Sequence, residues 1–452
     1  MSAAVATPLD YGLPLARIDL LCDPGTFLPL RSAVGDGVVA GQGRVAGRPV
    51  FAWAQDGALR GGSLGSAGGE TIARTIDLAD RAGAPVVGFL HSGGARLQEG
   101  TAALNAYAAI FRAQATARVP QVSVIAGACA GGAAYSPALG DLVVMAGPRA
   151  RLFLTGPQVV EAVTREVVTA EELGGPKVHA RSGVAHLVAS DDVTAAEVVR
   201  DALAHLPSVA GGPLPLAAPA APLSGDPSVP LPARERQVYD VREVIRRIVD
   251  AGALLELAPR WARNLVVGFA RIDGSPIGVV ANQPHYLGGC LDAAAGEKGA
   301  WFVQLCDRYG LPLVVLSDTP GFLPGTAQER AAVIRHGAAL LGAFARARVP
   351  RVTITLRQAY GGGHIVMNSR DLGATLTLAW PDARLGVMGA RQAVGIVHRR
   401  EIADGADPLE LADRYEEEHL PVAVAAEAGH VDEIIAPRHT RRRIAALLEA
   451  WR

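Results

Sequence analysis

The chain has 452 residues, of which 50% are hydrophobic, 19% are charged and 5% are aromatic. This composition is typical of a folded protein, and the length predicts two or three structural units rather than one core. The formal net charge is −1 and the Lys and Arg residues are scattered, so no binding surface for nucleic acid or for a membrane is indicated. Small molecules are the expected partners.

Targeting and metal-binding signals are missing from the sequence. No apolar run reaches the roughly 18 residues of a membrane span, and the N-terminus lacks the basic and apolar regions of a signal peptide. We therefore expect a cytoplasmic protein. No C-x₂-C pair suggests a zinc or redox site, and we expect no metal. The four cysteines stand far apart, at Cys22, Cys129, Cys290 and Cys306.

Short apolar runs alternate with helical segments along the chain. The runs are too continuous for half-exposed strands, so they predict strands buried on both faces. A first predicted helix covers residues 71–83 and ends at a glycine, and a second covers residues 105–119 and stops before Pro120. This order predicts an α/β fold with parallel strands and right-handed crossovers. The expected strands are 85–90, 121–127, 141–147, 312–317 and 351–356.

The sequence contains an internal repeat. The segment GGSLGSAGGE from Gly61 recurs as GGCLDAAAGE from Gly288, and at this offset Asp80 is matched by Asp307. Further along, ARVPQVSVIAGACAGGAA lies over ARVPRVTITLRQAYGGGH, with the register shifted by three residues. Such ordered matches indicate an internal duplication.

A segment rich in Pro, Ala and Gly separates the two repeats, from Leu206 to Arg236. It has no amphipathic period and indicates a connecting segment. We therefore expect an N-terminal domain over residues 1–220, a linker over 221–232 and a C-terminal domain over 233–452.

Glycine-rich turns follow the predicted strands in both halves. The two successive N–H groups of a glycine pair, at the positive end of a helix, can stabilise an oxyanion. One such donor is commonly worth about 3 kcal/mol in a transition state. An isolated pair more often marks a tight turn, but here it recurs at matching places, which favours function. The turns are HSGGAR at 91–96, ACAGGAAYS at 128–136, DTPGF at 318–322 and AYGGGHIVM at 359–367.

Other catalytic signatures are weaker. No G-x-S-x-G elbow, phosphate-binding loop or H-E-x-x-H motif occurs. His91, His336 and His364 are possible proton carriers, although a lone histidine is more often a packing or capping residue.

The motifs resemble the carboxyltransferase β subunits of biotin-dependent acyl-CoA carboxylases, of the actinobacterial acetyl- and propionyl-CoA type, over almost the whole chain. ARIDLLCDPGTF, GGSLGSAGGE, HSGGARLQEG and ACAGGAAYSPAL carry the likeness in the first half, and ANQPHYLGGCLD, TPGFLPGTAQE and AYGGGHIVMNS in the second. The resemblance implies two tandem crotonase-like domains and a ring-shaped hexamer. It also implies active sites between the first half of one subunit and the second half of another.

The resemblance further implies the reaction. Carboxybiotin releases CO₂, the ureido anion takes the α-proton of a short acyl-CoA, and the enolate attacks CO₂ to give malonyl-CoA or methylmalonyl-CoA. The biotin would come from an α subunit with biotin carboxylase and carrier parts, which this chain lacks.

Carried over by position, the family's catalytic glycines are Gly131, Gly132, Gly362 and Gly363. By analogy with crotonases, the first half holds the acyl-CoA and the second half holds biotin. The residues expected on the acyl-CoA side are Ser92, Gly93, Gly94, Arg96, Gly61, Gly62, Ala133 and Tyr135, with Ile365 as the position that sets acyl length. The residues expected on the biotin side are Gly321, Phe322, Tyr360, Gly361 and His364.

Several residues depart from the family pattern on the biotin side. Gly363 replaces an alanine, His364 a tyrosine, Ala327 an aspartate and Gln358 a lysine. These departures keep two alternatives open. One is a biotin-independent decarboxylase of malonyl- or methylmalonyl-CoA, since the same glycines would stabilise the same enolate. The other is a non-catalytic assembly subunit of a carboxylase complex. Fatty acid and polyketide precursors are both possible end uses.

Overall fold

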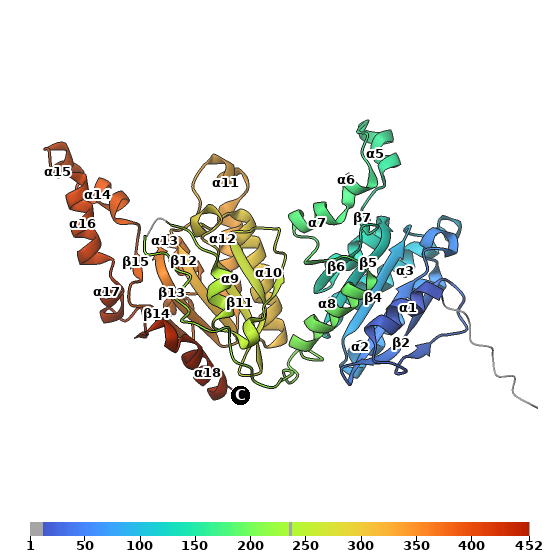
Figure 1. Ribbon diagram of the computed structural model, residues 1–452. Helices are drawn as coiled ribbons and strands as arrows, with labels where there is room; N and C mark the ends of the chain where they lie inside the picture. The colour runs from blue at the N-terminus through green and yellow to red at the C-terminus, as the bar shows by residue number, and fades with distance from the viewer. Residues whose placement is uncertain (1–11, 235–236, 452) are drawn as a thin grey trace, which may run out of the picture. The chain divides into compact units, whose positions relative to one another are not determined.

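The computed structural model describes residues 12–234 and 237–451. The chain divides into two compact units, Met1–Pro213 and Leu214–Arg452 (Figure 1). Each unit is built around its own mixed sheet and has its own buried apolar core.

In the first unit, the described residues form an eight-stranded sheet in the order β1-β2-β3-β4-β5-β6-β8, with β7 paired to β5. The pairs from β1 to β3 are antiparallel, and those from β3 onward are parallel. The strands are β1 (Leu28–Leu30), β2 (Val38–Val45), β3 (Arg48–Gln55), β4 (Val86–Ser92), β5 (Gln121–Ala130), β6 (Leu142–Ala146), β7 (Arg151–Phe153) and β8 (Leu187–Ala189).

Helices α2 and α3 of the first unit pack against each other, as do α1 and α8. The α-helices are α1 (Gly12–Leu21), α2 (Ser66–Ala82), α3 (Thr101–Thr116), α4 (Tyr135–Leu139), α5 (Pro157–Thr164), α6 (Ala170–Gly174), α7 (Pro176–Ser182) and α8 (Asp192–His205). The 3₁₀ turns are η1 (Leu59–Gly62), η2 (Leu97–Glu99) and η3 (Gly131–Ala134).

The second unit repeats this topology over its described residues, in the order β16-β14-β13-β12-β11-β10-β9, with β15 paired to β13. The pairs among β9, β10 and β11 are antiparallel, and the rest are parallel. The strands are β9 (Leu255–Leu257), β10 (Leu265–Ile272), β11 (Ser275–Asn282), β12 (Leu313–Thr319), β13 (Arg351–Tyr360), β14 (Leu376–Ala379), β15 (Arg384–Gly386) and β16 (Glu433–Ile434).

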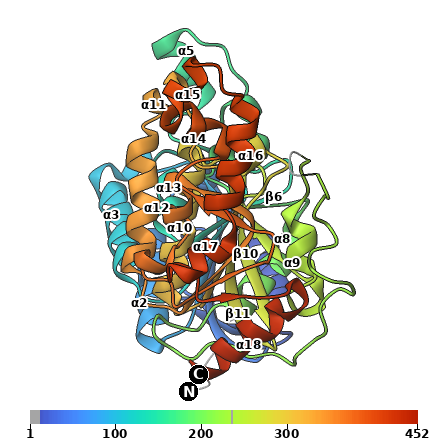
Figure 2. The ribbon, with the colours of Figure 1, turned by 90° about the vertical axis from the view of Figure 1, so that its left-hand side faces the viewer.

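Helices α10 and α12 pack together, and α14 to α16 extend away from the sheet of this unit (Figures 1 and 2). The α-helices are α9 (Val241–Arg246), α10 (Ala293–Tyr309), α11 (Thr326–Arg330), α12 (Val333–Arg346), α13 (Gly361–Val366), α14 (Ala390–Val397), α15 (Arg399–Ala403), α16 (Pro408–His419), α17 (Val422–Glu427) and α18 (Thr440–Ala450). The 3₁₀ turns are η4 (Asp250–Gly252), η5 (Leu287–Gly289), η6 (Arg370–Leu372) and η7 (Pro437–His439).

The helix that the sequence predicts over 71–83 begins earlier in the structure. Helix α2 starts at Ser66 and includes two glycines. A Cβ on Gly69 would lie 2.5 Å from the Cβ of Ala106 on α3, so the glycine allows the two helices to approach closely. The predicted end is confirmed, because Gly83 closes α2 in the left-handed conformation.

The duplication extends to single hydrogen bonds. The Asp23 carboxylate accepts the N–H groups of Ala46 and Gly47 and is paired with Arg200. In the second unit, Asp250 accepts the N–H groups of two turn residues and is paired with Arg441. Both carboxylates thus hold a hairpin turn to a distant arginine, which indicates that the two units inherited one pattern of contacts.

The Pro-rich segment differs from a free linker. The Ala217 N–H donates to the carbonyl of Gly274 over 3.0 Å, and the Leu223 N–H donates to Arg246 over 3.0 Å. The Ala251 N–H in turn donates to Ala221 over 2.9 Å. Extended backbone forms such bonds without any amphipathic period, so the sequence pattern carries no sign of them. The segment from residue 214 onward therefore belongs with the second unit, and it includes the whole of the expected 221–232 linker.

Among the described residues, no helix combines the length and apolarity needed to cross a membrane. The same residues contain no group of three or more His, Cys, Asp or Glu side chains placed to hold a metal ion.

Candidate active site

The carboxyl ends of β4 and β5 meet at one edge of the first sheet, because the two strands are parallel neighbours. The loop after η1 joins them there. The Leu64 N–H donates to the carbonyl of Gly94 over 2.8 Å, and the Arg96 N–H donates back to Leu64 over 2.9 Å. The Gly93 N–H also donates to Gly61 over 3.2 Å. Three backbone hydrogen bonds thus join the loop after η1 to the loop after β4, and together they form one rim.

The first glycine turn follows β5 at this rim. Gly131 has a φ of 64°, and its N–H donates to the carbonyl of Leu154 over 3.1 Å. Within the described residues, the Gly132 N–H has no hydrogen bond outside its own helical turn, as expected for the first N–H groups of a helix. The sequence predicts both glycines as donors, but Gly131 is already engaged. Of these two glycines, Gly132 is the one whose N–H remains available in this conformation.

The second turn follows β13. Gly361 has a φ of 55° and starts α13, so its counterpart in the first unit is Gly131. Gly362 then corresponds to Gly132, and Gly363 corresponds to Ala133. The predicted donors, Gly131 and Gly132 in the first unit and Gly362 and Gly363 in the second, are therefore not equivalent residue for residue. Since the N–H groups of the first helical turn lack intrahelical partners, Gly362 and Gly363 remain the predicted donors of this unit.

Gly363 is packed too tightly for a side chain to fit without a shift of its neighbours. A Cβ on Gly363 would lie 2.8 Å from the Cα of Gly321 and 3.1 Å from Thr319 Cγ2. By contrast, a Cβ on Gly362 would lie 3.5 Å from the ring of Phe322, which is ordinary contact. The glycine at 363 therefore fits the closer approach of the β12 end, and the turn remains intact.

Two residues predicted to bind the acyl-CoA lie beneath the rim. Ser92 is fully buried, and its hydroxyl shares a hydrogen bond of 3.1 Å with Tyr107 and accepts the Gly94 N–H. Arg96 is 3% exposed and is paired with Asp36 and Glu99. Both side chains support the loops in this structure. A direct contact with substrate stays a prediction.

The Arg96 cluster also holds the start of α2. The Glu99 carboxylate accepts both the backbone N–H and the hydroxyl of Ser66. The Ser66 N–H, and after it the Ser66 hydroxyl and Arg96, lower the pKa of Glu99 to about 2. Glu99 is therefore ionised at neutral pH, and the Arg96 guanidinium donates to the carbonyl of Ser63 over 2.8 Å. This fixes the loop between Gly62 and Leu64.

The other predicted residues surround the turns at different depths. Tyr135 is 54% exposed and Ile365 is 47% exposed, whereas the Tyr360 ring is buried with residues of α14 and α16. A Cβ on Gly62 would lie 2.3 Å from the carbonyl oxygen of His91. The two backbone segments approach so closely that only glycine fits at position 62. The exposed positions are Gly61, Gly93 and Gly362; the half-buried ones are Phe322 and His364; Gly94, Ala133, Gly321 and Gly363 are buried.

Two histidines near the turns are shifted towards the neutral form. Burial lowers the pKa of His91, and the charge of Arg17 acts in the same direction. The His91 ring fills the space where a Cβ on Gly57 or on Gly127 would lie, so His91 is a packing residue. Burial, and then the charge of His430, lowers the pKa of His364.

A hollow of about 600 Å³ opens beside the second turn. The apolar part of its lining includes Phe322, Pro324 and Met388, and Gln358 supplies an amide. Ala327 lies on the exposed helix α11 and does not line it. A separate hollow of about 650 Å³ in the first unit is lined by Arg17, Gln55 and His91 among others.

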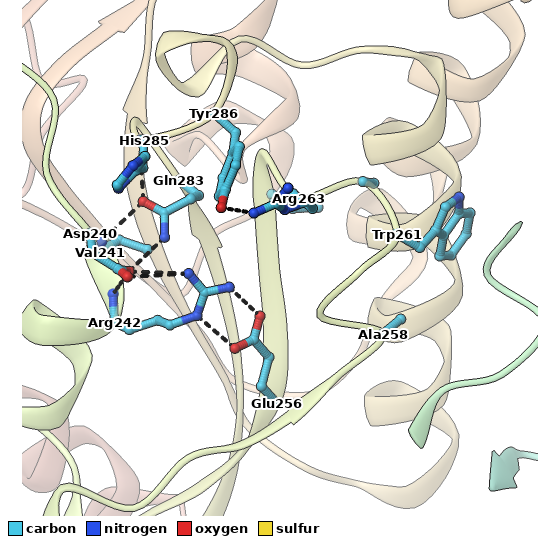
Figure 3. A network of polar contacts seen from close by, with 12 residues as sticks. Asp240, Val241, Arg242, Glu256, Ala258, Trp261, Arg263, Gln283, His285 and Tyr286 are labelled. Atoms are coloured by element: carbon cyan, nitrogen blue, oxygen red, sulfur yellow. Dashed lines mark hydrogen bonds and ion pairs between the residues drawn. The ribbon is translucent and has the colours of Figure 1, made fainter. Parts of the chain in front are cut away.

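A buried polar network holds the loop that leads to Gly288 (Figure 3). The Gln283 side chain is fully buried; its amide donates to Asp240 over 2.6 Å and its oxygen accepts the Val241 N–H. Arg242 then binds Glu256 through two hydrogen bonds of 2.7 Å each. Sequence reasoning missed these residues. The only local signal is Asp240, which precedes an apolar helix as an N-cap.

Comparison with known proteins agrees with this geometry. The sequence model of the carboxyl transferase domain family matches residues 12–452 of this chain.

The chain belongs to this family.

Among curated relatives, the propionyl-CoA carboxylase beta chain of Saccharopolyspora erythraea is 45% identical, over 96% of this chain and 86% of the relative. The biotin-dependent acetyl-/propionyl-coenzyme A carboxylase beta5 subunit of Mycobacterium tuberculosis is 45% identical, over 92% of this chain and 79% of the relative. The crystal structure of transcarboxylase 12S, with methylmalonyl-coenzyme A bound, superposes with a TM-score of 0.93 at 42% identity, covering 97% of this chain and 89% of that one. The resemblance and the tandem crotonase-like fold predicted from the sequence are confirmed.

Proposed function

We propose that this carboxyltransferase is the β subunit of a biotin-dependent acyl-CoA carboxylase. It carboxylates the α-carbon of a short acyl-CoA such as acetyl-CoA or propionyl-CoA. The observation that carries the proposal is the repeated glycine turn, which places N–H groups at a helix start in both units. Two turns suit a reaction in which two oxyanions must be stabilised.

The residues of this chain act by stabilising and positioning. The N–H of Gly132 would donate to the thioester oxygen as negative charge develops there, and Gly362 and Gly363 would donate to the second oxyanion. Each donor contributes about 3 kcal/mol of transition-state stabilisation. Three of them therefore supply a large part of the rate enhancement without a side-chain base.

The hollow beside the second turn suits biotin. Its lining combines apolar side chains with the amides of Gln237, Gln358 and Gln392 and the charged groups of Arg357, Arg391 and Glu416. This mixture suits an apolar bicyclic ring system that has a polar edge. Phe322, Met388 and Gln358 would hold the group next to Gly362. When bound, biotin supplies the carboxyl group and a proton acceptor. It would arrive on a biotinylated α subunit that also carries biotin carboxylase.

We further propose a homohexamer. The structure of transcarboxylase 12S is described as a hexamer assembly, and this chain exposes apolar side chains on matching helices of its two units. On α5, Val163 is 77% exposed, and on α14, Ile396 and Val397 are 67% and 66% exposed. All four cysteines are free, which supports action in a reducing compartment such as the cytoplasm.

The test is incorporation of labelled bicarbonate into acetyl-CoA and propionyl-CoA, with ATP and a biotinylated α subunit. We expect labelled malonyl-CoA and methylmalonyl-CoA. Failure with every compatible α subunit would contradict the proposal. Loss of CO₂ from malonyl-CoA without biotin would instead support the decarboxylase, and binding of neither CoA nor biotin would support the assembly subunit. The intact turn at Gly363 argues against the latter.

A further inference from the structure

Asp318 is a fully buried carboxylate at the end of β12, directly behind the second glycine turn. Its Oδ2 accepts a hydrogen bond of 2.7 Å from the Tyr239 hydroxyl and one of 2.7 Å from Arg357 Nε. In the part of the chain that the structure describes, Oδ1 has no hydrogen-bond partner. The Arg357 guanidinium also lies over the Tyr239 ring, 4.8 Å from its centroid. The three side chains form one compact cluster.

The cluster sits where the register between β12 and β13 changes. Ser317 pairs with Thr355, but Thr319 pairs with Ala359, so Asp318 alone faces residues 356–358. Such a bulge bends its strand and redirects the residues after it. Here β13 continues for two residues and then enters the glycine turn. The bulge therefore sets the direction of the N–H groups of Gly362 and Gly363.

The backbone of Asp318 reaches the other side of the same turn. Its N–H donates to the Asn282 side chain over 3.1 Å, and its carbonyl oxygen would lie 2.4 Å from a Cβ on Gly289. Three residues further on, Gly321 meets Gly363 so closely that no methyl group fits between them. Asp318 thus ties the ends of β11 and of the Gly289 loop to β12, the strand that leads to Gly321 beside the second turn.

The first unit has the same bulge without an ion pair. Leu90 pairs with Ile125 and Ser92 with Cys129, so His91 occupies the place of Asp318. The ring of His91 fills that place by packing against two glycines. The fold therefore does not need a charged pair at this position. A buried ion pair is also costly, and apolar replacements are often as stable. Its presence in the second unit points to a role at the site.

We propose that Asp318 is a positioning residue for the second oxyanion site. Through Tyr239 and Arg357 it clamps the bulge of β13 and holds the N–H groups of Gly362 and Gly363 in place. The inference rests on the proposed function. Burial raises the pKa of Asp318, and the charge of Arg357 opposes that effect. In the structure its Oδ2 accepts both hydrogen bonds.

The test is Asp318→Asn, which keeps the shape of the side chain and removes its charge. A displacement of about 1 Å costs about 10²-fold in rate. We therefore expect kcat of acyl-CoA carboxylation to fall about 10²-fold, with KM for acyl-CoA changed much less than kcat, since most residues assigned to acyl-CoA lie in the first unit. Tyr239→Phe removes one of the two hydrogen bonds and should give a smaller loss of kcat in the same direction.

The matched control is Asp250→Asn, which breaks the partly buried Asp250–Arg441 pair of 2.7 Å in the same unit. It should lower the melting temperature while leaving kcat near the wild-type value. Amide exchange of residues 361–364 should accelerate in Asp318→Asn and not in the control. A folded Asp318→Asn enzyme with wild-type kcat, or equal losses in both variants, would overturn the proposal. An inactive wild type would count against the proposed function alone, because amide exchange still tests the clamp.

Discussion

The second glycine turn allows the N–H donor to be separated from the shape of the residue that carries it. A Cβ on Gly362 would lie 3.5 Å from Phe322, so Gly362→Ala fits and keeps the N–H. Gly362→Pro removes the N–H at the second residue of α13, within the first turn, where helices tolerate proline. At Gly363, a Cβ would lie 2.8 Å from Gly321, so alanine there displaces the β12 end.

The expected magnitudes follow from these contacts. Loss of one oxyanion donor costs about 10²- to 10³-fold in kcat, so Gly362→Pro should lose that much while Gly362→Ala stays within about threefold of wild type. Gly363→Ala should fall between them, because it keeps the N–H but moves the turn. The assay is kcat of bicarbonate incorporation with saturating α subunit, alongside melting temperatures. Equal kcat values for folded Gly362→Pro and Gly362→Ala would refute the donor role.

Three further changes test other parts of the structure. Lys298 is fully buried, and its Nζ donates to three backbone carbonyls at 2.7–3.0 Å; Lys298→Met should lower the free energy of unfolding by about 2 kcal/mol. Burial lowers the pKa of Lys298 from 10.5 to about 7, so between these pH values the unfolded chain binds more protons than the folded one and the stability of the wild type rises with pH. In denaturant melts, the difference in free energy of unfolding between the wild type and Lys298→Met should therefore widen from pH 7 to 9. Ile365→Asp should shift the kcat/KM ratio towards propionyl-CoA without unfolding the protein, because Ile365 is 47% exposed; an unchanged ratio removes it from the acyl pocket. In Gly62→Ala the new Cβ would lie 2.3 Å from the His91 carbonyl oxygen, so this change should destabilise the protein by more than about 2 kcal/mol. In Gly61→Ala the new Cβ has no neighbour within 4 Å, so this change should destabilise it by only about 1 kcal/mol. Equal melting temperatures for the two variants would contradict this difference.

The sequence alone determined the duplicated architecture and the place of the glycine turns. Both are local properties: apolar runs and helix-ending glycines such as Gly83 report burial and backbone conformation directly. The match between the segments at Gly61 and Gly288 then showed that one topology occurs twice. The turns at Gly131 and Gly361 could be found for the same reason, since glycine pairs between a strand and a helix have a local cause.

Only the tertiary structure decided which groups at those turns are free to act. The Gly131 N–H is taken by Leu154, and Ser92 is covered by Tyr107. Asp318 is joined to Tyr239, a residue 79 positions earlier in the chain. Each of these partners lies far away in sequence and follows no repeating period. A hydrogen bond between distant residues depends on how the strands stack and where a bulge falls, and a local pattern of residue types does not contain that information.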